Sequence, residues 1–128
     1  MNHKFIKEDL YPYAEKILKT RCPESEGWIV QKQNKKQYEQ HLPDYIIDCP
    51  KERNILRVPV YLKCKMAACT EVVDYINNYC QGVPLNVLIV SKIVIYPSGA
   101  DTQAIPKDIL TLFIKEINIK KIAKEKEN

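Results

Sequence analysis

Features that would assign this chain to a membrane or secreted class are missing from its sequence. It has no uninterrupted apolar run of the ~18–20 residues that a membrane-spanning helix requires. Its opening, MNHKFIKEDL, places acidic residues where the apolar core of a signal peptide would lie. We therefore expect a soluble, cytoplasmic protein with no membrane partner.

The cysteines do not have the spacing of a zinc site. The chain has five, an odd number, and no two of them are separated as C-x-x-C. Only His3 and His41 are available to complete a metal site with them. We expect free thiols in a reducing compartment. The five are Cys22, Cys49, Cys64, Cys69 and Cys80.

Internal repeats, low-complexity segments and long linkers are also missing, so the 128 residues indicate one domain. We expect this domain to span residues 1–122, followed by a charged, disordered tail at 123–128. The net charge of +4 is compatible with a polyanionic partner. It is equally compatible with a solvated, lysine-rich surface.

Hydrophobic periodicity predicts alternating helices and strands. Apolar residues recur at helical spacing over 3–20, where Pro12 suggests a kink or a helix start. The most apolar stretch, 85–96, indicates a strand that is buried on both faces. The resulting order is helix, three strands, helix, strand, helix, strand, which predicts an α/β protein with a mixed central sheet flanked by helices. The other segments are expected as strands at 28–36, 43–49, 55–65 and 117–122, and as helices at 70–81 and 106–116.

Two β-rich runs, PDYIIDC and ILRVPVYLKCK, are joined by five turn-type residues and predict a hairpin. If the hairpin turns at Glu52–Arg53, Asp44 lies opposite Tyr61 and Asp48 lies opposite Arg57. Alternate residues of a strand share a face, so Lys63 and Lys65 would point the same way as Tyr61. In that register the same face would carry Asp44.

These residues resemble the PD-(D/E)xK nuclease superfamily, which has a restriction endonuclease-like fold. Pro43-Asp44 opens one strand, Lys63 follows 19 residues later in the next, and the predicted αβββαβ order also fits. The resemblance implies that Asp44 binds Mg²⁺, which polarises the scissile phosphate of DNA and lowers the pKa of a bound water. It implies that Lys63 is the catalytic lysine, and that Glu8 or Glu15 supplies a further acid.

The sequence departs from this family at Tyr61, which occupies the (D/E) position. A neutral phenol is a poor Mg²⁺ ligand. Asp48 lies about 13 Å farther along the strand and is better explained as the partner of Arg57. Glu71 and Asp74 on the following helix are the expected replacements. The expected metal ligands are therefore Asp44, Glu71 and Glu15.

Three functional hypotheses follow from these residues. The first is a nuclease-fold domain whose metal site is degenerate, which binds nucleic acid or a protein partner with little or no catalysis. The alternative is an active Mg²⁺-dependent DNA endonuclease with a relocated acid. The third is an unrelated α/β interaction module that forms an oligomer. The expected nucleic-acid contacts are Lys65, Lys32 and Lys35. Stacking on exposed bases is one role open to Tyr38, Tyr45, Tyr61 and Tyr96, and packing in a half-buried sheet is the more common role for each of them.

Overall fold

The predicted hairpin forms the centre of the sheet. In the computed structural model, which describes residues 6–66 and 70–127, β2 (Tyr45–Lys51) pairs antiparallel with β3 (Asn54–Leu62). The turn lies at residues 52–53, because Lys51 and Asn54 are the last paired residues. Asp48 lies opposite Arg57, which confirms the predicted register.

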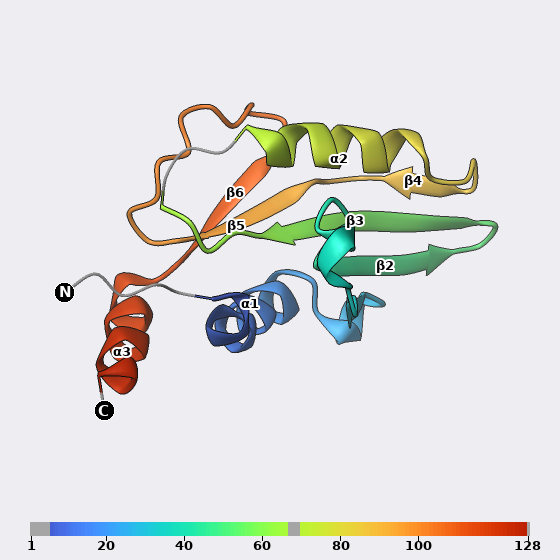
Figure 1. The fold of residues 1–128 in the computed structure, drawn as a ribbon. Coiled ribbons are helices and arrows are strands. Elements are labelled where there is room, and N and C mark those ends of the chain that lie inside the picture. Colours follow the sequence, from blue (N-terminus) through green and yellow to red (C-terminus); the bar gives the residue numbers. More distant parts are fainter. Residues whose placement is uncertain (1–5, 67–69, 128) are drawn as a thin grey trace.

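The remaining strands extend the hairpin on both sides into a mixed sheet (Figure 1). β1 (Ile29–Lys32) pairs antiparallel with β2. β4 (Val87–Ile89) and β5 (Ile93–Pro97) both run parallel to β3, beside successive parts of it. β6 (Leu110–Ile114) runs parallel to β5 at the far edge. The strand order is β1-β2-β3-β5-β6, with β4 on β3, and this confirms the α/β class with a mixed sheet flanked by helices.

Helices cover the two faces of the sheet separately (Figure 1). α2 (Glu71–Gln81) lies on one face, and α1 (Lys7–Arg21) and α3 (Glu116–Lys126) lie on the other. Two short 3₁₀ turns, η1 (Glu24–Glu26) and η2 (Gln37–Glu39), flank β1 in the chain. Alternation along the strands sends one set of side chains to each face. The α1 face buries Leu10, Ala14, Leu18, Tyr45, Ile47, Val58, Val60, Leu62, Ile93, Ile95, Ile114 and Ile122, and the α2 face buries Tyr61, Val72, Ile76, Val94, Tyr96 and Ile109.

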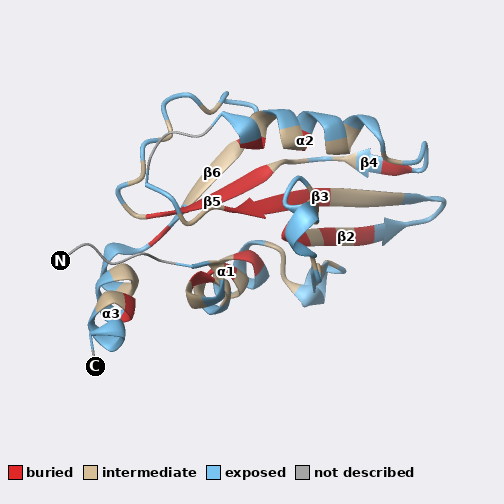
Figure 2. Ribbon diagram, viewed as in Figure 1, coloured by how far each residue is buried: buried red, intermediate tan, exposed pale blue. Residues whose placement is uncertain are grey.

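The apolar stretch at 85–96 forms two short strands rather than one. β5 is buried along its whole length, as predicted for a strand covered on both faces (Figure 2). β4 is only partly buried, and Leu88 and Val90 at this end of the sheet are 44% and 51% exposed. Burial on both faces is therefore restricted to the part of the stretch that lies between β3 and β6.

The last two elements are the reverse of the prediction. A helix was expected at 106–116 and a strand at 117–122, but the structure has β6 followed by α3. Ile109, Leu112 and Phe113 have helical spacing in sequence, yet Leu110–Ile114 also alternates. The exposed edge of β5 needs a partner for its backbone groups, and β6 supplies one over five paired positions. The lysine- and glutamate-rich segment that follows then forms the helix.

Both ends of the chain also differ from the prediction. α1 begins at Lys7 and continues through Pro12, so the helix does not start at the proline. Residues 3–5 of the expected helix lie outside the described residues. At the other end, α3 extends to Lys126, so residues 123–126 form its last turns rather than a disordered tail. The Nζ atom of Lys126 lies 2.8 Å from Oδ2 of Asp9, and this ion pair connects the end of α3 to α1.

Cys22, Cys49, Cys64 and Cys80 are free thiols, and Cys69 lies outside the described part of the chain. Among the residues described, no helix has the length and apolar character needed to cross a lipid bilayer.

Candidate functional site

Asp44, the expected metal ligand, is a buried residue at the entrance to β2. It lies in a bend just before Tyr45 and is 1% exposed. The Nζ atoms of Lys7 and Lys35 lie 3.0 and 3.1 Å from its Oδ1. The Tyr11 hydroxyl donates to Oδ1 at 3.2 Å, and the backbone N–H of Leu62 donates to Oδ2 at 2.8 Å. Both carboxylate oxygens are therefore occupied by donors from α1, β3 and the β1–β2 loop.

This cluster contains two ammonium groups for one carboxylate. Burial lowers the pKa of Lys35, and the adjacent Lys7 lowers it further, while Asp44 opposes both effects. Burial and the Asp44 carboxylate raise the pKa of Tyr11, which keeps its hydroxyl protonated as a donor. Mg²⁺ would have to displace two cations from Asp44, so the side chains present here do not fit the metal that the resemblance implies.

Tyr61, at the departure from the family pattern, packs inside the protein. It is 1% exposed and lies in the cluster under α2. Its hydroxyl donates to the backbone oxygens of His41 at 2.8 Å and Tyr75 at 3.3 Å. Burial raises its pKa, so the phenol stays neutral. Tyr61 therefore links β3 to the β1–β2 loop and to α2.

The prediction that Asp44 shares a face with Tyr61 and Lys63 is wrong. The Asp44 carboxylate contacts α1, whereas Tyr61 packs under α2 on the opposite face. Lys63 continues the β3 alternation, because its N–H donates to Ile95 O and its neighbours on both sides pack on the α1 face. Its side chain is therefore directed to the α2 face. The physical reason is that Asp44 precedes the strand, so its bent backbone does not follow the alternation.

The other expected acids lie at separate places. Glu71 is exposed at the first turn of α2, and Asp74 is exposed one turn later, on the face of the sheet opposite to the Asp44 carboxylate. Glu15 lies on α1, and burial together with this carboxylate raises the pKa of Tyr45, whose hydroxyl donates to the backbone oxygen of Tyr11 at 3.5 Å. Across residues 6–66 and 70–127, no group of three or more His, Cys, Asp or Glu side chains has the arrangement of a metal site.

A second polar cluster lies on the α2 side of the hairpin. Arg57 Nε and Nη2 donate to the two carboxylate oxygens of Asp48 at 2.7 and 2.9 Å, and its Nη1 donates to Tyr79 at 3.1 Å. The hydrogen bonds to Asp48 raise the pKa of Arg57. The predicted Asp48–Arg57 pair is therefore present, and it also binds α2 to the sheet.

The lysines expected to contact nucleic acid are at three different places. Lys35 is held in the Asp44 cluster with a 6% exposed side chain. Lys32 is exposed, with Nζ 3.9 Å from the centre of the Tyr11 ring. Lys65 is exposed beyond the end of β3. Only Lys32 and Lys65 are accessible to a large polyanion without rearrangement.

Lys7 and Tyr11 are the site residues that the sequence reasoning missed. They are four residues apart, which places them on one face of α1. Recognising Asp44 as their common acceptor requires the tertiary structure, because 33 residues separate Tyr11 from it.

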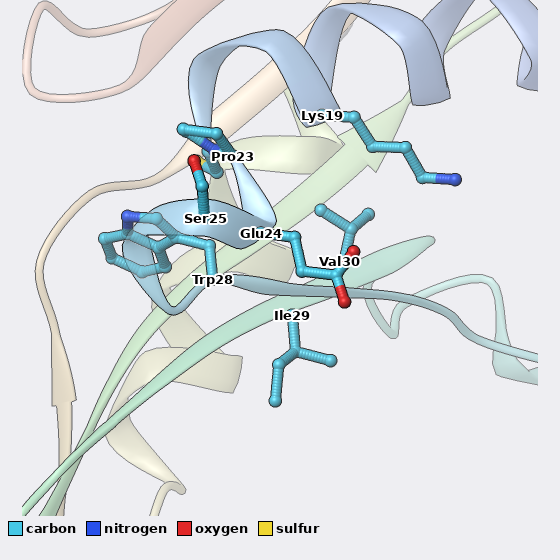
Figure 3. Close-up of a pocket in the computed structure, with 8 residues that line it drawn as sticks. Lys19, Pro23, Glu24, Ser25, Trp28, Ile29 and Val30 are labelled. Carbon is cyan, nitrogen blue, oxygen red and sulfur yellow. The ribbon is translucent and has the colours of Figure 1, made fainter.

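A hollow on the protein surface lies away from these clusters (Figure 3). It has a volume of ≈ 500 Å³ and lies between the end of α1, η1 and β1. Burial raises the pKa of Cys22 in its lining, which favours the protonated thiol over the nucleophilic thiolate. No histidine is among its lining residues, so Ser25 has no general base there. The lining residues are Lys19, Cys22, Pro23, Glu24, Ser25, Trp28, Ile29 and Val30.

Comparisons with family models, with curated protein sequences and with solved structures found no match to this chain.

Proposed function

We propose that this protein is a catalytically inactive binding module with the topology of the PD-(D/E)xK nucleases, and that nucleic acid is its partner. The topology is supported by α1, the antiparallel β1–β2–β3 unit, α2 and the parallel β5, which have the expected αβββαβ order once the short β4 between α2 and β5 is set aside. β6 and α3 extend this core at its far edge.

The observation that supports the loss of catalysis is the state of Asp44. Its carboxylate has no exposed surface and is bound by two ammonium groups, a phenol and a backbone amide. A hydrolytic metal site needs carboxylate oxygens that are free to bind the ion and an open position for water. Here Lys7 and Lys35 occupy the place that Mg²⁺ would take at Asp44. The Asp44 carboxylate therefore connects parts of the fold instead of binding a metal.

A nucleic-acid partner is supported by the charge around the β1–β2 loop. Residues 27–38 contain Lys32, Lys35 and Lys36 and no acidic residue, and Lys32 and Lys36 are exposed whereas Lys35 is paired with Asp44. The first acid after them, Glu39, accepts a hydrogen bond from the backbone N–H of Lys36. A local cationic excess of this kind attracts phosphate and would make affinity depend on salt.

The test combines a cleavage assay with a binding assay on the purified protein. We expect no cleavage of duplex, single-stranded or branched DNA with Mg²⁺ or Mn²⁺, and binding to at least one of them that weakens as salt rises. We also expect Tyr61→Glu to gain no activity, because the new carboxylate would be buried under α2.

Metal-dependent cleavage that is lost in both Asp44→Ala and Lys63→Ala would overturn the proposal in favour of an active endonuclease. Both variants must first be shown to fold by circular dichroism. A complete lack of DNA and RNA binding, or binding that is insensitive to salt, would instead indicate a protein partner.

A further inference from the structure

The β1–β2 loop, residues 33–44, is fixed at its base and exposed at its tip. Gln33 N donates to Asp44 O at 2.9 Å, and Lys35 Nζ donates to Leu42 O at 2.9 Å. Lys7 of α1 donates to Gln40 at 3.3 Å. The Tyr61 hydroxyl from β3 donates to the backbone oxygen of His41. The Asp44 cluster therefore holds the base of this loop against both α1 and the sheet.

An aromatic side chain projects from the tip of this fixed loop. Tyr38 lies in η2 and is 74% exposed, in a turn that Figure 2 colours as exposed. The turn is closed locally, because Glu39 accepts from the N–H of Lys36 and donates its own N–H to Lys36 O at 2.8 Å. A large ring held in solvent by a hydrogen-bonded turn adds little to the stability of the fold and is accessible to a partner that stacks on it.

The charges around Tyr38 indicate an anionic partner. Lys36 is exposed, with Nζ 6.0 Å from the centre of the Tyr38 ring, and Lys32 is exposed at the end of β1. The adjacent acid, Glu39, accepts a hydrogen bond from the backbone N–H of Lys36, and the buried Asp44 carboxylate is balanced by two lysines. The side chains of Gln31, Asn34 and Gln37 are exposed among the lysines and add hydrogen-bond donors and acceptors.

We propose that the loop binds single-stranded nucleic acid, with one base stacked on Tyr38 and the backbone phosphates on Lys36 and Lys32. Stacking on an aromatic side chain requires a base that is free of its own stack, which a single strand offers and a continuous duplex does not. An acidic peptide would satisfy the lysines but would leave the tyrosine without a planar partner. This inference rests on the proposed function and specifies its surface and the form of the nucleic acid.

The test is fluorescence anisotropy with a labelled oligothymidylate of about twelve nucleotides, the matching oligouridylate, a duplex of the same length and an oligoglutamate peptide. We expect the single strands to bind more tightly than the duplex or the peptide. Tyr38→Ala should weaken single-strand binding about tenfold, and Tyr38→Trp should preserve it. Lys36→Gln should weaken it and reduce the slope of log affinity against log salt by about 0.7.

Two variants serve as matched controls for charge and aromatic surface. Lys121→Gln removes an exposed lysine from α3, and Phe113→Ala removes a ring that is 43% exposed on β6. We expect neither to change the affinity. Equal unfolding midpoints for Tyr38→Ala and the wild type would show that the loss of binding is local.

The outcomes separate this inference from the proposed function. If nucleic acid binds but Tyr38→Ala and Lys36→Gln have no effect, or the duplex binds more tightly, the inference is wrong and the proposed function stands. If no nucleic acid binds, both are wrong. Tyr38-dependent binding of the acidic peptide that exceeds binding of the single strands would overturn both and identify a protein partner.

Discussion

The backbone N–H of Leu62 donates a 2.8 Å hydrogen bond to Oδ2 of Asp44, and this contact joins the entrance of β2 to the end of β3. The same carboxylate holds Lys7 of α1 and Lys35 of the β1–β2 loop. A residue that a sequence pattern assigns to metal binding is therefore the point at which three parts of the fold are connected.

Removing this carboxylate should destabilise the protein strongly. Asp44→Ala would leave the ammonium groups of Lys7 and Lys35 partly buried without a counter-ion, at a cost of about 3–5 kcal/mol in the free energy of unfolding. Denaturant titration followed by circular dichroism measures this change. The double variant Asp44→Ala/Lys35→Met should be more stable than Asp44→Ala, because one uncompensated charge is removed.

The control for this prediction is Glu125→Ala, which removes an exposed carboxylate from α3 and should change stability by less than about 0.5 kcal/mol. A metal-binding carboxylate without a structural role would give a different result. Its removal would leave stability unchanged or would increase it, because repulsion within the site would be relieved.

The Arg57–Asp48 pair should contribute measurably to stability through its geometry. Arg57→Lys keeps the charge but loses the two-point contact with Asp48 and the contact with Tyr79, which should cost about 1–3 kcal/mol. Lys92→Gln removes a second ion pair, in which Nζ lies 3.6 Å from Asp108 and the acid is 66% exposed. This control should cost less than about 0.5 kcal/mol. Equal effects in the two variants would contradict the prediction.

Stability should fall in alkaline solution. Burial raises the pKa values of Tyr11, Tyr45 and Tyr61 above the ordinary value of 10.0. Above about pH 10 the unfolded chain releases protons that the folded chain retains, so the free energy of unfolding decreases as pH rises. Guanidinium titrations from below pH 10 upward measure the slope. Tyr61→Phe should lower stability by about 1 kcal/mol at neutral pH and make the alkaline decrease shallower. A free energy of unfolding that does not change above pH 10 would contradict the raised pKa values of these tyrosines.

The packing of α3 can be tested with a pair of isoleucines. Ile122 is 4% exposed in the cluster under α1, and Ile117, one and a half turns earlier on the same helix, is 73% exposed. Ile122→Ala should cost about 2–5 kcal/mol in the free energy of unfolding. Ile117→Ala should cost less than about 0.5 kcal/mol. Similar losses in both variants would contradict the packing of α3, in which only Ile122 of this pair is buried.

Elements with one dominant signal were predictable from the sequence. The hairpin follows from two alternating runs and a five-residue turn, and its register followed from placing the turn at Glu52–Arg53. α2 has a single apolar face, on which Val72 and Ile76 are buried, and it ends before Gly82. The prediction failed where two periods fit the same residues, as in Leu110–Ile114. At Leu110–Ile114 the strand formed instead of the helix because the edge of β5 needed a strand to pair with its backbone groups.

The candidate site also has one part that was predictable from the sequence and one part that was not. The sequence determined the Asp48–Arg57 pair, because the two residues lie on adjacent strands joined by a short turn and their separation along the chain sets their register. Only the tertiary structure decided the role of Asp44. Its partners Lys7 and Lys35 come from a helix and a loop that no local pattern connects to it, and its side chain leaves the strand alternation at a bend. A buried charge is stabilised by whatever opposite charges the fold brings to it, and that information lies in three dimensions.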